Sequence, residues 1–252
     1  MGKSRLIRTK ITSRANLAEM DYRNKVQLTQ EKYDSPQKWL QMINDGRLSY
    51  VPKLKEFRIY GRVLELGAGS AWLSSELSKF PAVKKVYCLD FSEAILSRVT
   101  PVIMKHLNAD TTKITRIVGD FNKLEFKDSY FGFVFFDAAL HHITDMDSVL
   151  SEIRRVLKPN GKLIAIREPV IPILRPWIKA SFGKEDKEQG VTENIYTMKE
   201  WRGFFARNGL KLQFFPFLSG NRALFKILNK WPFSSLNKYL FAHFIFVAHK
   251  ER

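Results

Sequence analysis

Short apolar runs alternate with helical patterns through the middle of the chain. Five of these runs have the length of buried strands: Arg62–Leu66, Lys85–Leu89, Ile114–Val118, Phe131–Phe136 and Lys162–Ile166. Buried strands that alternate with helices are typical of a mostly parallel α/β sheet. Two more apolar runs, Leu210–Phe217 and Phe241–Ala248, follow near the end of the chain. We therefore predict an α/β fold with a seven-stranded sheet and helices on both faces.

Start and stop signals for helices lie between these strands. A helix is predicted from Trp72 to Phe80, where Pro81 ends it. Further helices are predicted from Ser92 towards His106 with an interruption at Pro101, from Asp145 or Asp147 to Leu157, and from Thr197 to Arg207.

Three segments outside this core are less regular. Residues 1–60 are predicted to form a helical N-terminal extension, and residues 61–252 the main domain. Within that domain we expect insertions at about residues 169–195 and 219–240. Loops can vary while the sheet is unchanged, so these segments are expected to hold the substrate.

The positive charge lies mainly in the flanks of the chain. The formal net charge of the 252 residues is +17, of which residues 61–170 contribute 15 basic against 13 acidic side chains. We therefore expect an anionic partner to meet the flanks. The one cysteine, Cys88, excludes an intrachain disulfide and favours a reducing, cytoplasmic location. No apolar run is long enough to span a bilayer.

A glycine-rich turn follows the first predicted strand and opens a helix. Its sequence is Glu65-Leu66-Gly67-Ala68-Gly69. Glycines let the backbone turn sharply and approach a ligand closely. A plain tight turn has the same pattern, so the motif alone does not identify a ligand site.

Acidic residues end the next three predicted strands. Asp90 follows the second, 21 positions beyond Gly69, and Asp120 and Asp137 follow the third and fourth. The carboxyl ends of parallel strands line the ligand crevice of this architecture. We therefore expect these aspartates and Glu65 to share one edge of the sheet. Asp90 can accept both hydroxyls of a ribose, and the alternative for it is a helix cap.

Four segments resemble the successive motifs of class I S-adenosylmethionine (SAM)-dependent methyltransferases. They are VLELGAGSAWLSSEL, VYCLDFSEAIL, IVGDFNKLEFKDSYFGFVFFDAALHHI and LSEIRRVLKPNGKLIAIREP, and they span about residues 61–168. The chain is most similar to the subgroup that includes ubiquinone and menaquinone C-methyltransferases and small-molecule O-methyltransferases. The resemblance implies a Rossmann-like, mostly parallel sheet whose last strand is antiparallel. Ala71 departs from the family, which often has a third glycine there.

The resemblance also implies where SAM binds. Glu65 and Gly67 would lie near its methionine part, and Ala68 and Gly69 of the same loop would also contact the cofactor. Asp90 would hold the ribose hydroxyls, with Phe91 on the adenine. The remaining residues implied are Asp120 and Phe121 beside the adenine, and Asp137 and Ala138 near the sulfonium and amino-acid tail.

Methyl transfer to oxygen needs a base, because the acceptor must lose a proton. His142 and His141 follow the fourth strand, and an imidazole titrates near neutral pH, so either is a candidate. We favour His142 slightly; the alternative is that both shape the pocket. Glu168 is a further candidate, unless it pairs with Arg167. We predict no metal site.

A basic and aromatic segment near the end of the chain bears on the identity of the methyl acceptor. The segment Asn221–Tyr239 mixes apolar and aromatic residues with Arg and Lys. It fits a core-facing helix, an element that touches an anionic membrane surface, or a nucleic-acid surface. We predict O-methylation of a small-molecule, glycan or lipid-linked acceptor. Nucleic acid ranks lower, because Ala-Ala-Leu-His-His after Asp137 lacks the Pro-Pro-aromatic signature of base N-methyltransferases.

Two other classes remain open. A nicotinamide-dependent dehydrogenase could use the same turn and Asp90, although Trp72 occupies the place of its third glycine and Asp120 is unexplained. A non-catalytic SAM-binding protein is the second, because a fold does not determine a function.

Overall fold

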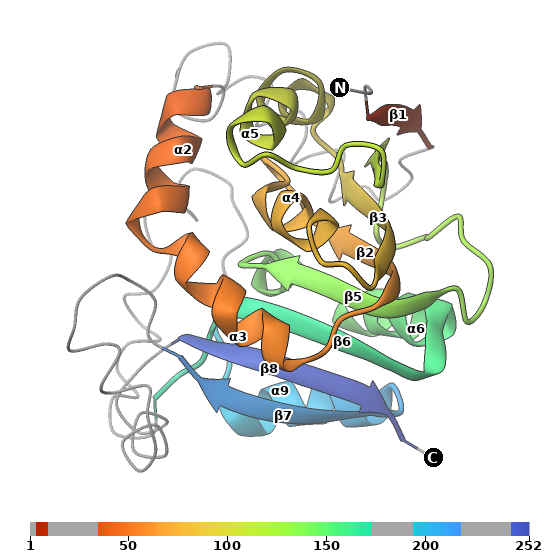
Figure 1. The fold of residues 1–252 in the computed structure, drawn as a ribbon. Helices are drawn as coiled ribbons and strands as arrows, with labels where there is room; N and C mark the ends of the chain where they lie inside the picture. The colour runs from red at the N-terminus through yellow and green to blue at the C-terminus, as the bar shows by residue number, and fades with distance from the viewer. Residues whose placement is uncertain (1–3, 10–34, 173–193, 218–242, 252) are drawn as a thin grey trace.

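One sheet of eight strands forms the centre of the protein (Figure 1). The computed structural model describes residues 4–9, 35–172, 194–217 and 243–251. The strand order is β1-β4-β3-β2-β5-β6-β8-β7. The strands are Arg5–Arg8 (β1), Gly61–Leu66 (β2), Val83–Asp90 (β3), Ile114–Val118 (β4), Phe131–Asp137 (β5), Leu157–Pro169 (β6), Leu210–Pro216 (β7) and His243–Lys250 (β8).

The strand directions confirm the predicted Rossmann-like class. The pairs from β1 to β6 are all parallel, and β8 runs antiparallel to both of its neighbours, β6 and β7. All seven predicted strands are present, and the sheet has one more than expected. The additional strand is β1, which pairs with β4 at the edge of the sheet.

Helices cover both faces of the sheet, as predicted (Figure 1). They are Pro36–Asp45 (α2), Val51–Glu56 (α3), Trp72–Ser78 (α4), Thr100–His106 (α5), Met146–Val156 (α6) and Met198–Arg207 (α9), with short turns at Arg47–Tyr50 (η1), Ile95–Val99 (η2) and Leu140–His142 (η3). Two apolar cores result, one with the buried residues of α6 and α9 and one with those of α2 to α5. The carboxyl edge of the sheet is thereby held rigidly between two packed layers.

Local signals explain why these helices begin where they do. The Asp145 side chain accepts a hydrogen bond from the Ser148 amide at 3.0 Å, which caps α6. Thr197 and Glu200 form a capping box at the start of α9. Pro101 lies in the first turn of α5, directly after the π-helical turn η2, so the predicted interruption appears as a change of helix type.

The prediction of a helical extension over residues 1–60 is wrong at its start. Residues Arg5–Arg8 form strand β1, because an edge strand can pair with the exposed backbone of β4. The helices α2 and α3 agree with the prediction. Most of the two predicted insertions, together with the segment Asn221–Tyr239, lies outside the described residues.

Candidate active site at the carboxyl edge of the sheet

The predicted acidic residues lie on one edge of the sheet. The last register pairs of β2 place Gly67 between Asp90 at the end of β3 and Asp137 at the end of β5. Asp120 follows β4, which pairs with β3. Glu65 lies two residues before Gly67 in β2. The structure therefore brings these four carboxylates to the carboxyl ends of four adjacent strands.

The turn after β2 needs both of its glycines. Gly67 has a φ of +65°, and a Cβ there would lie 2.7 Å from the Cβ of Ala139. Gly69 has a φ of +48°, and its Cβ would approach the Trp39 ring at 3.2 Å. Ala71 has a φ of +55° and stands just before α4. It thus takes a left-handed conformation that a glycine would adopt without strain.

Strained backbone gathers at this edge. The described residues include six non-glycine residues with positive φ, and three of them are Ala71 before α4, Ala138 after β5 and Arg167 near the carboxyl end of β6. Such conformations persist only where surrounding structure holds them, and they concentrate at functional sites. Ala138 is fixed by a bond of 2.9 Å from its amide to the Ile166 carbonyl.

Asp90 holds the glycine turn in place. Its Oδ2 accepts a hydrogen bond from the Gly69 amide at 2.8 Å, and its Oδ1 accepts one from the Ser92 amide at 2.8 Å. The Ala68 amide also bonds to the Leu89 carbonyl, at 3.0 Å. A carboxylate offers about four acceptor positions, so bonding to the loop is compatible with bonding to ligand hydroxyls.

Asp120 and two phenylalanines lie beside this turn. The Oδ1 of Asp120 accepts bonds from the amide and the side chain of Asn122, at 2.8 and 2.7 Å. Phe91 and Phe121 directly follow Asp90 and Asp120 and are both buried. The predicted adenine residues therefore come from adjacent strand ends.

Glu65 is a buried carboxyl group with one unsatisfied oxygen. Its Oε2 accepts hydrogen bonds from the amide of Ser74, at 2.9 Å, and from the Ser74 hydroxyl. Its Oε1 has no hydrogen-bond partner among the described residues. Burial raises the pKa of Glu65 to about 8. A buried acceptor without a partner is costly, so this oxygen suits a cationic group of a ligand.

Two arginines and a tryptophan surround the carboxylate of Asp137 and stabilise its ionised form. Arg167 Nε donates to it at 2.6 Å and Trp72 Nε1 at 2.5 Å, while Arg47 Nη1 lies 3.6 Å away. Although burial opposes ionisation, Arg167 and Arg47 hold the pKa of Asp137 below its usual range.

Two residues of the N-terminal extension cover the turn, and the sequence did not identify them. Trp39 of α2 lies against Gly69, and the guanidinium of Arg47 stacks 5.1 Å above the Trp39 ring. Burial lowers the pKa of Arg47 to about 10. A tryptophan and an arginine in a basic helical segment carry no signal that connects them to a loop twenty or more residues away.

Glu168 is fully buried and turned back into the protein. Its Oε1 accepts bonds from the amides of Ala139 and Leu140, both at 3.1 Å. Its Oε2 accepts bonds from the amide of His141 at 3.2 Å and from the His141 ring Nδ1 at 2.8 Å. Glu168 does not pair with Arg167, which bonds to Asp137 instead. Both oxygens of Glu168 are thus bonded to the turn Ala139–His141, which makes Glu168 a weaker candidate for the base than the histidines.

The two histidines share the turn η3 but differ in their surroundings. His141 is buried and is oriented by Glu168. His142 is half-buried, and its ring centre lies 4.3 Å from that of His141. A base that is oriented by a carboxylate is the arrangement used in many enzymes, so His141 becomes the stronger candidate.

Among the described residues, no group of three or more His, Cys, Asp or Glu side chains gathers as a metal site would require. Every helix in the described ranges is too short or too polar to cross a bilayer.

The sequence of this chain is similar to those of known methyltransferases. Residues 64–165 match the family model described as a methyltransferase domain. A demethylmenaquinone methyltransferase of Staphylococcus haemolyticus is 31% identical over 136 residues, which are 53% of this chain and 55% of that protein. A ubiquinone/menaquinone biosynthesis C-methyltransferase of Burkholderia mallei is 28% identical over 54% of this chain and 60% of its own length. The chain thus spans about half the length of the curated relatives it matches.

Solved structures agree in fold. A SAM-dependent methyltransferase of Mesorhizobium loti superposes with a TM-score of 0.56 at 17% identity, over 80% of this chain and 98% of that one. A phosphoethanolamine N-methyltransferase of Haemonchus contortus was solved with S-adenosylhomocysteine. It superposes with a TM-score of 0.57 at 20% identity, over 83% of this chain and 55% of that one. These superpositions confirm the predicted Rossmann-like fold, and the family match over residues 64–165 makes this part of the chain similar to methyltransferase domains.

Proposed function

We propose that this protein, which carries a class I SAM-dependent methyltransferase domain, transfers a methyl group from SAM to a hydroxyl-bearing small molecule. The observation that carries the proposal is the assembly of the glycine turn, Asp90 and the unsatisfied Glu65 on one sheet edge. Ligands of open α/β sheets bind at this edge.

The residues at the edge fit the parts of SAM. Asp90 would accept the ribose hydroxyls while it holds the Gly69 amide. Phe91 and Phe121 would flank the adenine, with Asp120 as acceptor for its amino group. The Oε1 of Glu65 would accept a hydrogen bond from the α-ammonium group, since it is a buried acceptor without a partner among the described residues.

Arg47 supplies a further contact that the sequence did not suggest. Its guanidinium is held between Trp39 and Asp137 at the edge of the turn. A carboxylate is the natural partner of a partly desolvated guanidinium. We therefore place the methionine carboxylate at Arg47, with Ala138 and Asp137 lining the same end of the site.

SAM supplies a methyl group that its sulfonium already activates, so the protein's task is to hold the acceptor in line and to remove its proton. With Nδ1–H of His141 donating to Glu168, the lone pair of Nε2 faces away from the carboxylate. The acceptor hydroxyl would give its proton to Nε2 as its oxygen bonds to the methyl carbon of SAM. The bond from that carbon to sulfur would break, and S-adenosylhomocysteine would leave with the electron pair on its sulfur. The buried Glu168 would then stabilise the imidazolium.

The acceptor class follows from this base. A phenol or quinol loses its proton readily, and the resulting anion is nucleophilic at oxygen and at the adjacent carbon. The quinone methyltransferases among the relatives make the carbon a serious alternative to oxygen. Glycan and lipid-linked acceptors remain within the proposal. Anionic membrane contact and a cytoplasmic location stay predictions, and nucleic acid ranks below a small molecule.

The test is to incubate the protein with SAM and a panel of phenols, catechols and quinols. S-adenosylhomocysteine and methylated product are measured by mass spectrometry, with Asp90→Ala and His141→Gln as comparison variants. We expect the wild-type protein to release S-adenosylhomocysteine only when an acceptor is present, and we expect both variants to lose this release. Calorimetric binding of SAM without release for any acceptor would instead indicate a non-catalytic SAM-binding protein. Binding of NAD in place of SAM would indicate a dehydrogenase.

A further inference from the structure

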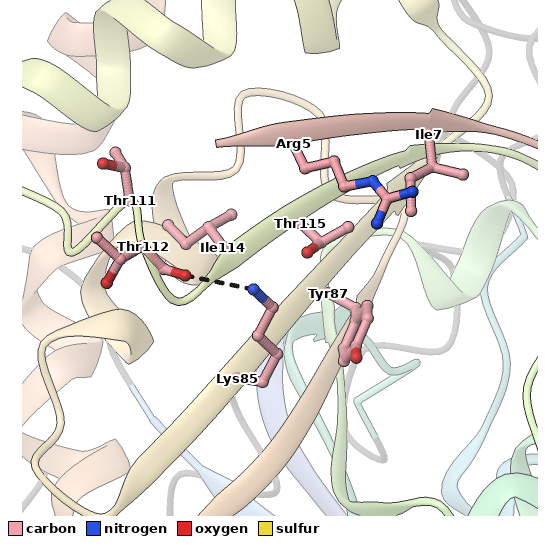
Figure 2. Close-up of a pocket in the computed structure, with 8 residues that line it drawn as sticks. All are labelled: Arg5, Ile7, Lys85, Tyr87, Thr111, Thr112, Ile114 and Thr115. Carbon is pink, nitrogen blue, oxygen red and sulfur yellow. Dashed lines mark hydrogen bonds between the residues drawn. The ribbon is translucent and has the colours of Figure 1, made fainter. Parts of the chain in front are cut away.

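A second hollow lies at the opposite, amino edge of the sheet (Figure 2). Its volume is about 330 Å³, and it is lined by Arg5, Ile7, Lys85, Tyr87, Thr111, Thr112, Ile114 and Thr115. Lys85 precedes Asp90 by five residues of β3, or about 16 Å at about 3.3 Å per residue. The hollow is therefore separate from the proposed methyl-transfer site.

Strand pairing explains how these side chains meet. The register places Arg5 of β1, Thr115 of β4 and Tyr87 of β3 in one row across three parallel strands. Adjacent strands lie about 4.8 Å apart, so side chains of this row share one small area of the sheet face. The chain between β4 and β5 forms no helix, which leaves the amino end of this face open.

A bulge aims Lys85 at the hollow. The β2–β3 register shifts between the pairs Gly61–Val83 and Arg62–Lys85, so that Lys84 is an extra residue. Bulges commonly redirect a side chain in this way. Figure 2 shows Arg5 of β1 and Lys85 of β3 on the lining of one hollow, with the Lys85 amine turned towards Thr112. Lys85 Nζ donates to the Thr112 carbonyl at 3.3 Å.

The lining has two unneutralised cations and no acid. Neither Arg5 nor Lys85 forms an ion pair within the described part of the chain, and none of the eight lining residues is acidic. Arg62 adds a third positive charge nearby. It stacks 4.4 Å above the Tyr130 ring, whose hydroxyl is 3.0 Å from that of Tyr87.

A buried hydroxyl and apolar walls complete the hollow. Thr115 is 4% exposed and contributes a hydroxyl-bearing side chain to the lining of the hollow. Ile7, Ile114 and the Tyr87 ring line the remaining surface. Two cations with a hydroxyl donor suit a dianion with several oxygens, and the volume exceeds what a phosphate group alone would fill.

We propose that this hollow binds a small phosphomonoester. Arg5, Lys85 and the Thr115 hydroxyl contact its phosphate, and its organic part packs on Tyr87 and Ile7. The site is independent of the proposed methyl transfer, so the failure of either proposal leaves the other standing.

Calorimetry with inorganic phosphate and with phenyl phosphate tests the proposal on the full chain. We expect saturable binding of both, tighter for phenyl phosphate, and a loss of at least about tenfold in Lys85→Gln and in Arg5→Gln. Lys84→Gln is the matched control: it removes the adjacent lysine, which does not line the hollow, and should bind as the wild type does. An equal loss in Lys84→Gln, or no saturable binding by the wild type, would overturn the proposal.

A lipid could present the same phosphate as a soluble metabolite does. Flotation with phosphatidylcholine vesicles, with and without phosphatidic acid, distinguishes the two sources. Capture that requires phosphatidic acid and is lost in Lys85→Gln indicates a lipid phosphomonoester. Soluble binding without capture indicates a metabolite.

Discussion

The charge state of Glu65 predicts how the affinity for S-adenosylhomocysteine depends on pH. This product of the donor carries the same ammonium and carboxylate groups as SAM. Glu65 is fully buried, and its pKa is raised to about 8 because burial disfavours the carboxylate. At neutral pH the group is therefore mainly protonated in the free protein. An ammonium ion beside Oε1 favours the ionised form, so binding releases a proton from Glu65.

The expected magnitude follows from that pKa. With a value of about 8, about 1% of Glu65 is ionised at about pH 6 and about 9% at about pH 7. The affinity should therefore rise about ninefold over this interval, equivalent to about 1.3 kcal/mol. The α-amino group of the ligand keeps its proton over most of the same range, because its ordinary pKa is about 7.7 to 8.0.

Calorimetry at both pH values, in buffers of different ionisation enthalpy, measures the affinity and the proton release together. In Glu65→Gln the pH dependence should disappear, since an amide does not titrate in this range. Glu56→Gln is the control, because Glu56 is exposed and pairs only with Lys53 among the described residues. An affinity that is flat in the wild type, or that rises equally in Glu65→Gln, would refute the assignment of Glu65 to the ammonium group.

Three further predictions concern the rest of the site. Asp90→Ala should weaken S-adenosylhomocysteine binding by about 100-fold or more in calorimetry, because two charged hydrogen bonds are lost; an unchanged affinity would contradict the ribose assignment. His141→Gln should lower turnover by about 100-fold with little change in that affinity, and by more than His142→Gln does; the reverse ranking would make His142 the base. Arg47→Met should weaken binding of S-adenosylhomocysteine about tenfold but leave that of adenosine, which has no carboxylate, unchanged; equal losses would argue against the carboxylate contact.

Much of the fold could be predicted because it depends on local patterns. The five central strands are short, mainly apolar runs, and acidic residues lie at the carboxyl ends of the first four: Glu65, Asp90, Asp120 and Asp137. Strands of a parallel sheet are covered by helices on both faces and are therefore mainly apolar. Their positions in the sequence can be recognised without knowing which helix packs on which face. The glycine turn was equally visible, because its backbone conformation excludes most side chains.

The features that escaped prediction depend on contacts between distant segments. Strand β1 has only four residues and exists because β4 offers it an edge. Glu168 lies near the carboxyl end of β6, yet its carboxylate turns back to the amides of Ala139 and Leu140. Arg47 reaches Asp137 across ninety positions of sequence. In each case the sequence shows the residue type but not the partner.

A crystal structure with S-adenosylhomocysteine is the most direct test of the central claim. We expect the ligand along the carboxyl edge, with its ribose hydroxyls on Asp90, its adenine between Phe91 and Phe121, and its ammonium group on Glu65. Ligand density anywhere else on the sheet, or no ligand density at the carboxyl edge of a soaked crystal, would contradict the account.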